Sequence, residues 1–564
     1  MDTKNNGKEN LIKQVENSYH KDCQIIKTTL SIKGKEVAIF YIESLINKLL
    51  FSTGILAPLE RLVQDEMSRS DNSGQKNTQN NANNSKNTKQ TSSDDSLIQI
   101  IKNEIVSISS VKEESNVDKI LEDILSGFAV IVADDNALCC PVYGVEKRGI
   151  QEPPTSRVVK GPREGFVEDI ATNVGLVRIR IKTKNLRIID INIGEQTQTK
   201  ISLFYLQDIA KQDVVEDVKS RLKKIKIDGI IDSYYIESLL ESNNFKFFRR
   251  VGNTEKPDVF CAKLLEGRVG MIIDGSPIAL TVPYILLEDL QSPEDYYTIP
   301  AKATFTRIMR IIGLILSLLI PGIYVALQNY NYRLLPINFL ITLLSSIEGL
   351  SVPPLIEILL VLLLFEIITE ASLQMPNSLG MALSIIGALA LGNTAVDAGI
   401  ISPPSIVAVA VSSVSLYIIP DQISESRLLR ILFTLLGGIV GLYGIVVGFI
   451  ILTTHLCQIK SFGVPYLSPI APSVKSDKKD SFIKQSIQEM KQRPVFFADK
   501  NKTRIANVGH QKTEQQERNE TKNEDNQNHI KASQTDKLQK TNKKDIKILK
   551  KYCKNAKNNK LKEG

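Results

Sequence analysis

The chain has 564 residues and a net charge of +8. At roughly 100–200 residues per domain this length excludes a single ordinary domain. The average composition, 43% hydrophobic and 23% charged, excludes neither a membrane segment nor a disordered one. Residues 305–457 are strongly apolar, whereas residues 68–96 and 475–564 are almost wholly polar.

The positive charge is concentrated at the C-terminal end. Residues 475–564 hold 24 Lys and Arg against 12 Asp and Glu, so this tail carries +12 and the rest of the chain about −4. A basic tail can bind nucleic acid, but we favour a solvated tail beside an anionic membrane surface and expect no nucleic-acid partner. We expect the tail 475–564 to be mostly disordered, with one short amphipathic helix predicted by the spacing of Phe482, Ile483, Ile487 and Met490.

Cysteine usage and the first residues indicate a cytoplasmic location for the front of the chain. The six cysteines include no CxxC pair, and Cys139 is followed directly by Cys140, which suits neither a zinc site nor a disulfide framework. Residues 1–22 contain no apolar run of a secretory signal. We therefore expect a reducing compartment.

Two segments of the chain look like copies of one another. Residues 37–45 match 201–209 at an offset of 164, and residues 124–134 match 264–274 at an offset of 140. Each match is a buried strand next to a helix pattern. The offsets differ by 24 residues, which a polar insert in the first copy can supply. After a flexible N-terminus, 1–23, we predict α/β subdomains at 24–145, with a disordered insert at 68–96, and at 166–300.

The connector between the copies, 146–165, is predicted to be stiff and extended at its proline pair. It leads into a helix that we expect to begin near Phe166, to expose Arg178, Arg180 and Lys182, and to carry Glu164 close to its N-terminus, where a carboxylate is favoured. Arg163 has no such local reason, so we expect it to pair with an acidic group on a neighbouring subdomain or subunit; an exposed surface arginine is the alternative. The candidate connector and assembly residues are Pro153, Pro154, Gly161, Pro162, Arg163, Glu164 and Gly165.

A transmembrane domain is predicted at 301–457, followed by a post-membrane segment, 458–474. The segment 336–347 is too short to span a bilayer. Lys and Arg flank both ends of the domain, which places both ends in the cytoplasm and requires four or six crossings, with four favoured. The candidate spans are 307–327, 355–373, 378–396, 402–420 and 430–456.

Polar residues within this domain are candidates for an ion path. Carboxylates in a membrane are costly and face protein or water; the acids of 355–373 fit an ion path or an interfacial helix, and both interpretations stay open. The small residues of 378–397, and the glycine pairs Gly437/Gly441 and Gly444/Gly448, favour helix packing. The candidate pore or intramembrane polar residues are Glu357, Glu366, Glu370, Asn393, Thr394 and Asp397. The chain shows no metal, nucleotide or nucleophile motif, so we expect neither a cofactor nor an enzyme.

Ordered short motifs give the chain a resemblance to the A subunits of GerA-type spore germinant receptors, over residues 120–472 with a weaker extension through 24–62. Beside Asn173, the motifs lie at 152–154, 161–166, 227–233, 249–257, 265–269, 274–277, 291–297, 319–321, 324–327, 348–349 and 461–467.

The resemblance implies a subunit of the spore inner membrane that works with a transporter-like B subunit, which senses nutrients, and a lipoprotein C subunit. It also implies a homo-oligomer embedded in lipid that forms a cation channel and opens when nutrient binds the partner. The alternative is a paralogous transporter or assembly subunit linked to dipicolinic-acid release. The insert 68–96 and the basic tail depart from the compact family pattern.

Overall fold

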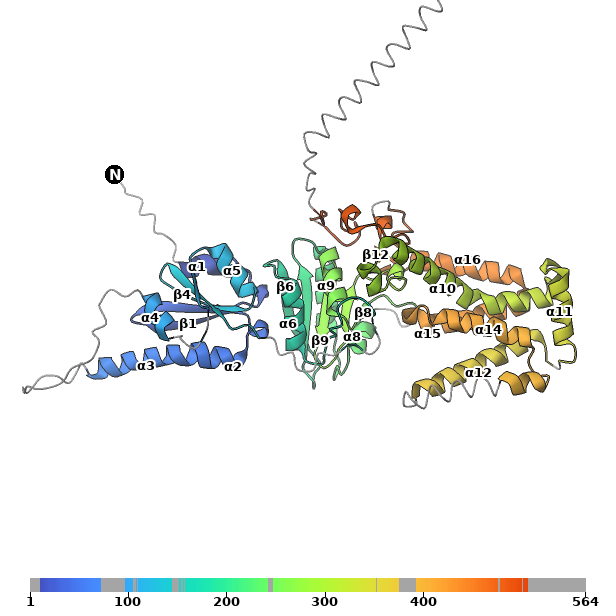
Figure 1. Ribbon diagram of the computed structural model, residues 1–564, viewed down its shortest axis with the longest axis horizontal. Coiled ribbons are helices and arrows are strands. Elements are labelled where there is room, and N and C mark those ends of the chain that lie inside the picture. The colour runs from blue at the N-terminus through green and yellow to red at the C-terminus, as the bar shows by residue number, and fades with distance from the viewer. Residues whose placement is uncertain are drawn as a thin grey trace, which may run out of the picture. The chain divides into compact units, whose positions relative to one another are not determined.

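The computed structural model describes residues 11–72, 97–104, 108, 110–144, 152–153, 156, 158–241, 247–350, 352–374, 392–474, 477–499 and 501–505 (Figure 1). The elements below belong to the compact unit Met1–Arg504. The predicted insert at 68–96 begins inside a helix that continues to Asn72, and its remainder lies outside the described residues. Pro154, most of the predicted span 378–396 and the tail beyond residue 505 also lie outside them.

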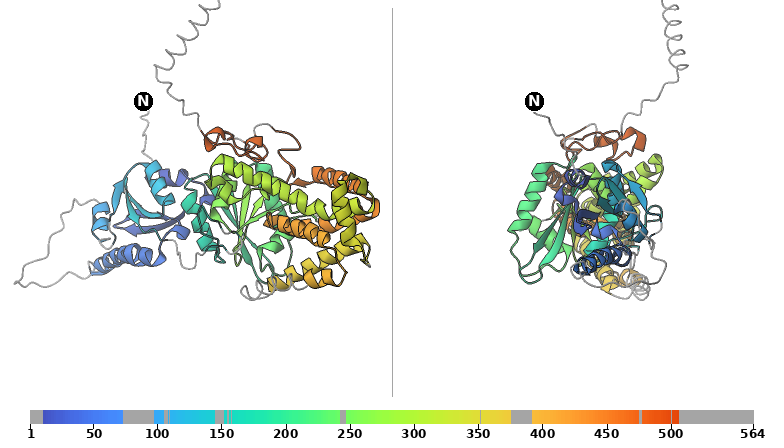
Figure 2. Two further views of the ribbon diagram at one scale, coloured as in Figure 1. Left: turned by 45° about the vertical axis from the view of Figure 1, so that its right-hand side comes forward. Right: turned by 90° about the vertical axis from the view of Figure 1, so that its left-hand side faces the viewer.

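The first subdomain is an antiparallel sheet with helices on both faces (Figures 1 and 2). Its strand order is β1-β2-β4-β5-β3. Alternate strand residues pack against α2–α4 on one face and against α1 and α5 on the other, as the alternation of side chains in a strand requires. Its elements are α1 (Leu11–Asn17), β1 (Ile26–Ile32), β2 (Lys35–Tyr41), α2 (Lys48–Phe51), α3 (Ala57–Asn72), α4 (Leu97–Glu104), β3 (Lys112–Glu114), α5 (Val117–Leu125), β4 (Phe128–Ala133) and β5 (Asn136–Pro141).

The second subdomain repeats this architecture with the strand order β6-β7-β9-β10-β8. Helices α7 and α8 cover one face of the sheet, and α6 and α9 cover the other. Helix α9 starts with Pro257 and ends at Gly267, which has φ of +106° and so adopts a conformation that glycine favours. Its elements are α6 (Ile170–Arg180), β6 (Leu186–Ile193), β7 (Thr199–Leu206), α7 (Gln212–Lys224), α8 (Ser233–Leu240), β8 (Gly252–Thr254), α9 (Pro257–Glu266), β9 (Val269–Ile273) and β10 (Ala279–Val282).

The register of the two sheets agrees with the predicted duplication. Val37 pairs with Ala133 in the first sheet, and Ile201 pairs with Ile273 in the second, at offsets of 164 and 140. In the following hairpin Ile131 pairs with Leu138, but Met271 pairs with Leu280. The second hairpin is therefore longer by two residues, and the offset becomes 142 beyond it.

Two expectations for the helix after the connector are wrong. Helix α6 begins at Ile170, because Asp169 caps it by accepting a hydrogen bond from the Thr172 amide (2.7 Å), so residues 163–166 precede it. Arg178 is only 2% exposed rather than on the outer face. Its guanidinium donates to the carbonyl of Cys23, which links the second subdomain to the first, and burial lowers the pKa of Arg178 to about 10.

The remaining helices form an all-α region. Among the described residues α10 is the one helix long and apolar enough to cross a membrane; a second crossing requires counting α14 and the stretch Pro420–Val440, bent by 112°, as one span. The helices are α10 (Pro300–Asn329), α11 (Ile337–Ile347), α12 (Pro354–Gln374), α14 (Pro403–Leu416), α15 (Ile423–Val440) and α16 (Leu442–Gln458).

The predicted spans 402–420 and 430–456 are wrong as continuous helices. Helix α14 stops at Leu416, and the short 3-10 turn Pro420–Gln422 redirects the chain into α15. The stretch 430–456 is divided between α15 and α16 at Gly441, whose φ of +75° and ψ of −158° end the first helix. Glycine is the residue that tolerates this conformation.

Glycines also set the crossing of α10 and α15. A Cβ added to Gly437 on α15 would lie 2.3 Å from the Gly322 carbonyl oxygen on α10. The two backbones therefore meet directly, as small residues at helix interfaces allow. This agrees with the packing role expected for Gly437.

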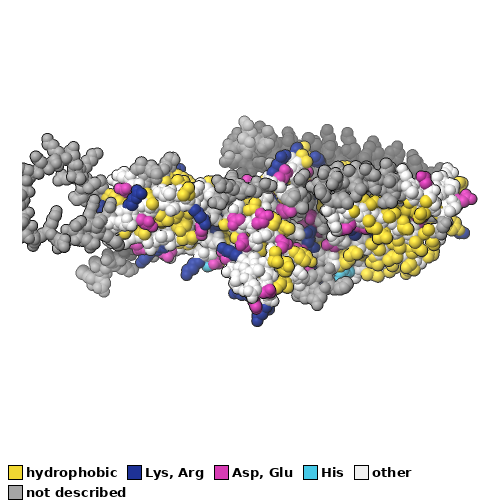
Figure 3. Space-filling model, turned by 90° about the horizontal axis from the view of Figure 1, so that it is seen from below, with side chains coloured by type: hydrophobic (Ala, Val, Ile, Leu, Met, Phe, Trp, Pro, Cys, Tyr) yellow, Lys and Arg dark blue, Asp and Glu magenta, His cyan; other side chains and the backbone are white. Residues whose placement is uncertain are grey.

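Hydrophobic side chains cover much of the visible surface of the helical region, whereas charged side chains of both signs are spread over the sheets (Figure 3). Large exposed apolar side chains occur on α10, α11, α12 and α16; for example, Phe305, Ile341 and Leu363 are each 60% exposed, and Ile451 is 64% exposed. An apolar surface of this extent is typical of a protein that contacts lipid or other subunits.

The segment after α16 folds back onto the second subdomain. It contains the two-stranded pair β11 (Lys460–Ser461) and β12 (Val464–Pro465), and then short 3-10 turns at Asp477–Lys479 and Ile487–Glu489. The short amphipathic helix predicted for residues 482–490 is therefore wrong. Instead, Ala498 forms a β-bridge with Ala210, and Phe497 lies under the Arg268 guanidinium at 4.1 Å.

Candidate functional site

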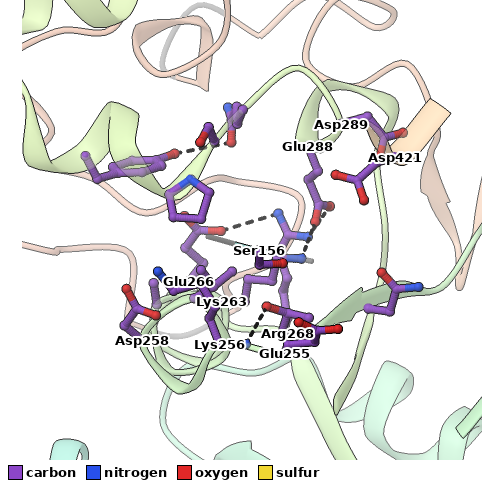
Figure 4. Close-up of a pocket in the computed structure, with 18 of the residues that line it drawn as sticks. Ser156, Glu255, Lys256, Asp258, Lys263, Glu266, Arg268, Glu288, Asp289 and Asp421 are labelled. Carbon is purple, nitrogen blue, oxygen red and sulfur yellow. Dashed lines mark hydrogen bonds and ion pairs between the residues drawn. The ribbon is translucent and has the colours of Figure 1, made fainter. Parts of the chain in front are cut away.

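A cavity of 660 Å³ lies between the second sheet and the helical region (Figure 4). Five parts of the chain build its wall: the stretch 249–278 with β8 and α9, the linker 283–299 between β10 and α10, the connector at Ser156, the turn at Pro420 and Asp421, and the C-terminal segment. From the C-terminal segment come Ile487, Met490 and Arg504. Charged side chains dominate the polar lining, and five of them belong to two buried groups: Arg249, Lys263, Arg268, Glu288 and Asp289.

The first group surrounds Glu288, which ends a 3-10 turn, Leu286–Glu288. Its carboxylate accepts from the Ile285 amide (3.0 Å) and pairs with Arg268 and with Lys263, whose Nζ lies 2.8 Å from Oε2. Arg268 also reaches the Pro283 carbonyl at 3.2 Å. Burial on its own would raise the pKa of Glu288, but Arg268 and Lys263 outweigh it and hold that pKa below its usual value.

The second group surrounds Asp289, the next residue. Arg249 Nη2 lies 2.8 Å from Asp289 Oδ1, and the Tyr284 hydroxyl donates to the same oxygen. Gln422, from the turn between α14 and α15, donates to Oδ2 at 2.5 Å. Burial raises the pKa of Tyr284 well above its ordinary value, and the Asp289 carboxylate adds to that rise. Asp289 thus joins the second subdomain to the helical region.

A third group fixes the start of α10. Asp295, in the 3-10 turn Pro293–Tyr297, accepts from Arg307 Nε at 3.1 Å and from Arg310 Nη1 at 2.8 Å. Arg307 is 1% exposed. Its Nη1 donates to Asp480 Oδ1 at 3.0 Å, and the Lys484 ammonium donates to the Asp295 carbonyl. The linker, the first turns of α10 and the C-terminal segment are therefore tied together by one ionic cluster.

This cluster is not predicted from the sequence, because Arg307 and Arg310 are interpreted there as positive flanks of a membrane span. The sequence does contain one indication. The acid Asp295 lies only a few turns before Arg307 and Arg310, with Lys302 between them, so opposite charges are concentrated at the expected membrane boundary. For Glu288 and Asp289 the signal was their place within the apolar run 285–290. Charges inside an apolar run are expected to be paired when the run is buried.

The predicted connector residues lie beside this linker. Gly161 has φ of +121°, and a Cβ there would lie 2.7 Å from the Tyr297 ring. The amide of Lys160 donates to Glu294 at 3.4 Å, and that of Val159 donates to the same carboxylate. The connector thus contacts the turn that precedes α10.

The other connector residues differ in their surroundings. Pro153 and Gly165 are buried, and Pro162 is half-buried. Glu164 pairs with Arg180 of α6 at 2.5 Å instead of stabilising a helix N-terminus. Arg163 is exposed and has no ion-pair partner within the part of the chain that the structure describes.

The predicted polar residues of the helical region form separate groups. Glu357 is 1% exposed and accepts from the amide (2.6 Å) and hydroxyl (2.7 Å) of Ser402. Glu366 pairs with Arg430 at 2.7 Å and Arg427 at 3.3 Å. The contacts of the described residues do not join these two acids to each other.

The remaining candidates in the helical region are on its surface. Glu370 accepts from Gln374 at 2.9 Å near the end of α12. The side chains of Asn393, Thr394 and Asp397 are exposed in a helical stretch, 392–397. Among the described residues, no three His, Cys, Asp or Glu side chains are grouped so that they could hold a metal ion.

The sequence of the chain is similar to those of one family of known proteins. The sequence matches the family described as Bacillus/Clostridium GerA spore germination protein over residues 9–496. It is 38% identical to spore germination protein KA of Bacillus subtilis over 72% of this chain and 76% of that protein. It is 32% identical to spore germination protein GerLA of Bacillus cereus over 72% of this chain and 84% of that protein.

The chain belongs to the GerA spore germination protein family. An uncharacterized membrane protein of Bacillus subtilis, YfkQ, is 37% identical over 70% of this chain and 77% of that protein. The solved N-terminal domain of the A subunit of the Bacillus megaterium spore germinant receptor GerK3 aligns with 48% of this chain and 91% of that domain, at 27% identity and a TM-score of 0.32. The family assignment rests on the sequence matches and not on this superposition.

Proposed function

We propose that the chain is the A subunit of a nutrient germinant receptor in the inner membrane of a spore. The observation that carries this proposal is its membership of the GerA family over residues 9–496. The relatives KA and GerLA are both named spore germination proteins, which supports the same role here. The proposed partners are a transporter-like B subunit, a lipoprotein C subunit, further copies of this chain and membrane lipid.

We infer a multi-pass topology with an even number of crossings, four being favoured, and with both terminal regions in the cytoplasm. The apolar surface of α10, α12 and α16 supports a lipid environment for this region. The short helices α14 and α11 do not span a bilayer by themselves, because about 20 helical residues are needed.

We further propose that several copies surround an ion path. Glu357 and Glu366 are engaged inside one chain, by Ser402 and by Arg430, which makes them structural groups within the helical region. Glu370 and Asp397 are on the surface of one chain and remain accessible to an aqueous path between chains. Polar groups in a membrane domain require such a path or a protein partner.

The ionic clusters offer a route from the sheets to the helices. Asp295 and Asp289 each connect the linker after β10 to helical elements through Arg307 and Gln422. A displacement of the second subdomain would therefore also shift the start of α10 and the turn before α15. We propose that a signal from the partner subunit reaches the membrane helices by this route.

Reconstitution tests the proposal directly. The chain, co-expressed with the B and C subunits of its own spore former, would be placed in liposomes, and cation efflux would be measured with and without nutrient. Nutrient-dependent efflux is expected, and Glu370→Gln with Asp397→Asn should reduce it without reducing assembly. Lys223→Gln, on the exposed surface of the second subdomain, is the control. A fully assembled complex that conducts no cations with or without nutrient would refute the channel.

A further inference from the structure

The 660 Å³ cavity contains a lysine that the described residues leave without a partner. Lys256 is one of the residues that line the cavity (Figure 4). It is 0% exposed, and although its backbone amide donates to Thr254 Oγ1 at 3.2 Å, its Nζ has no hydrogen-bond partner within the described part of the chain. The neighbouring cations Lys263, Arg249 and Arg268 each pair with a buried carboxylate. A buried ammonium without an anion carries a large desolvation cost.

The position of Lys256 in the fold increases this cost. The residue is the N-cap of α9, directly before Pro257, and its side chain makes no capping hydrogen bond. The N-terminus of a helix is positively polarised, so a cation there is unfavourable and an anion is favoured. Asp258 already places one carboxylate in the first turn of α9, so it is the unpartnered Lys256 ammonium that calls for negative charge in this part of the cavity.

The rest of the lining specifies the kind of anion. Apolar surface comes from Val259, Ala262, Ile278, Met490 and the rings of Tyr296 and Tyr297. A mixed apolar and charged cavity of this size falls in the range of small-molecule sites, about 300–1,000 Å³. One free ammonium matches one negative charge on an otherwise apolar molecule better than it matches a multiply charged inorganic ion.

Two acceptors in the lining have no partner either. Glu255 Oε2 and Asp258 Oδ1 are buried and make no hydrogen bond with the described residues, although Asp258 Oδ2 accepts from the Tyr297 hydroxyl at 2.8 Å. A buried acceptor without a donor is costly. A ligand that carries a hydrogen-bond donor in addition to its anionic group would satisfy one of them.

We propose that this cavity binds a small organic carboxylate, whose carboxylate group pairs with the Lys256 ammonium and whose own hydroxyl or amine donates to Glu255 or Asp258. The ligand would contact α9, the linker before α10 and the C-terminal segment together, because each contributes to the wall. Its binding would stabilise that junction. The inference rests on the cavity alone and does not depend on the proposed receptor role.

Thermal unfolding of the full chain in detergent provides the test, with benzoate and 4-hydroxybenzoate as probes and benzamide and 4-hydroxybenzamide as their neutral counterparts. A ligand that binds only the folded state raises the unfolding temperature in a saturable way. We expect both carboxylates to do so, the hydroxylated one at lower concentration, and each amide to bind at least about tenfold more weakly, which corresponds to about 1.4 kcal/mol.

Variants separate the site from general anion effects. Lys256→Met should abolish the carboxylate-dependent shift and, because it removes an unpaired buried charge, leave the unliganded protein at least as stable. Lys223→Met, which removes an exposed lysine of α7, should leave the shift unchanged. The proposal is overturned if neither carboxylate binds better than its amide, or if Lys256→Met keeps the full shift; either result would leave Lys256 solvated by water only.

Discussion

Gln422 donates a hydrogen bond of 2.5 Å to Asp289, although the two residues are 133 positions apart in the chain. Gln422 ends the turn between α14 and α15, and Asp289 follows the second sheet. Asp289 also binds Arg249 and Tyr284, so a single buried carboxylate is shared by the sheet and the helices. Removing one partner of such a carboxylate leaves part of its buried charge uncompensated, which is costly.

Loss of Arg307 should destabilise the start of α10. Arg307→Ala removes the cation that Asp295 and Asp480 share; Arg310 still pairs with Asp295, and Asp480 is 24% exposed, so the cost should be below the roughly 3–5 kcal/mol of a fully uncompensated buried charge. We expect a clear fall in the unfolding temperature of the purified chain and faster proteolysis after residue 477. Arg333→Ala, at an exposed position after α10, is the matched control. Equal unfolding temperatures for the two variants would contradict the ionic cluster as a structural element.

A methyl group at Gly437 should separate α10 from α15. In Gly437→Ala the new Cβ would meet the Gly322 carbonyl oxygen at 2.3 Å, and backbone atoms cannot move aside as a flexible side chain can. We expect the protein to accumulate poorly and to lose cysteine cross-links engineered between α10 and α15. Gly392→Ala is the control, because a Cβ there has no neighbour within 4 Å. Normal cross-linking in Gly437→Ala would show that the helices do not cross at this glycine.

Acid should weaken the junction through Asp295. Burial on its own would raise the pKa of this carboxyl, but Arg310 and Arg307 hold it below its ordinary value. The unfolded-state pKa is about 3.9, so the stabilisation is complete above about pH 4 and is lost as the pH falls through the lower folded-state value. In Asp295→Asn the unfolding temperature should therefore fall less steeply below pH 4 than in the unmodified chain.

The control for this pH dependence is Asp135→Asn, in the exposed turn between β4 and β5. That variant should keep the steep acid limb. If Asp295→Asn keeps it as well, the acid sensitivity arises from other carboxylates, and Asp295 is not held in its charged form by the arginines.

Arg163 should act between subunits. It is exposed, and no described residue pairs with it, whereas the adjacent Glu164 is engaged by Arg180 within the chain. We expect Arg163→Ala to reduce assembly, measured by size-exclusion chromatography of the complex in mild detergent. The free energy of unfolding of the single chain should change by less than about 0.5 kcal/mol. Lys160→Ala, nearby and also exposed, is the control. Unchanged assembly in Arg163→Ala would show that Arg163 is an ordinary surface residue without a role in assembly.

The sequence alone determined the repeated sheets. The offsets of 164 and 140 predicted two copies of one unit, and the structure relates equivalent strand pairs by these offsets, Val37 with Ala133 and Ile201 with Ile273. Strand and helix periodicity indicates which side chains are buried, and a duplicated unit shows the same periodicity twice. Local patterns also predicted the apolar region, but they could not predict its break at Gly441, since the same residue is tolerated inside a helix when packing requires it.

Only the tertiary structure decided which charges are buried together. Arg178 looked like an exposed residue of α6 until the first subdomain supplied the Cys23 carbonyl, 155 positions away. Arg307 looked like a membrane flank until Asp480, 173 positions away, proved to be its partner. A local pattern contains the charge of a side chain but not the distant group that neutralises it, and in a buried site that distant group determines whether the charge is tolerated.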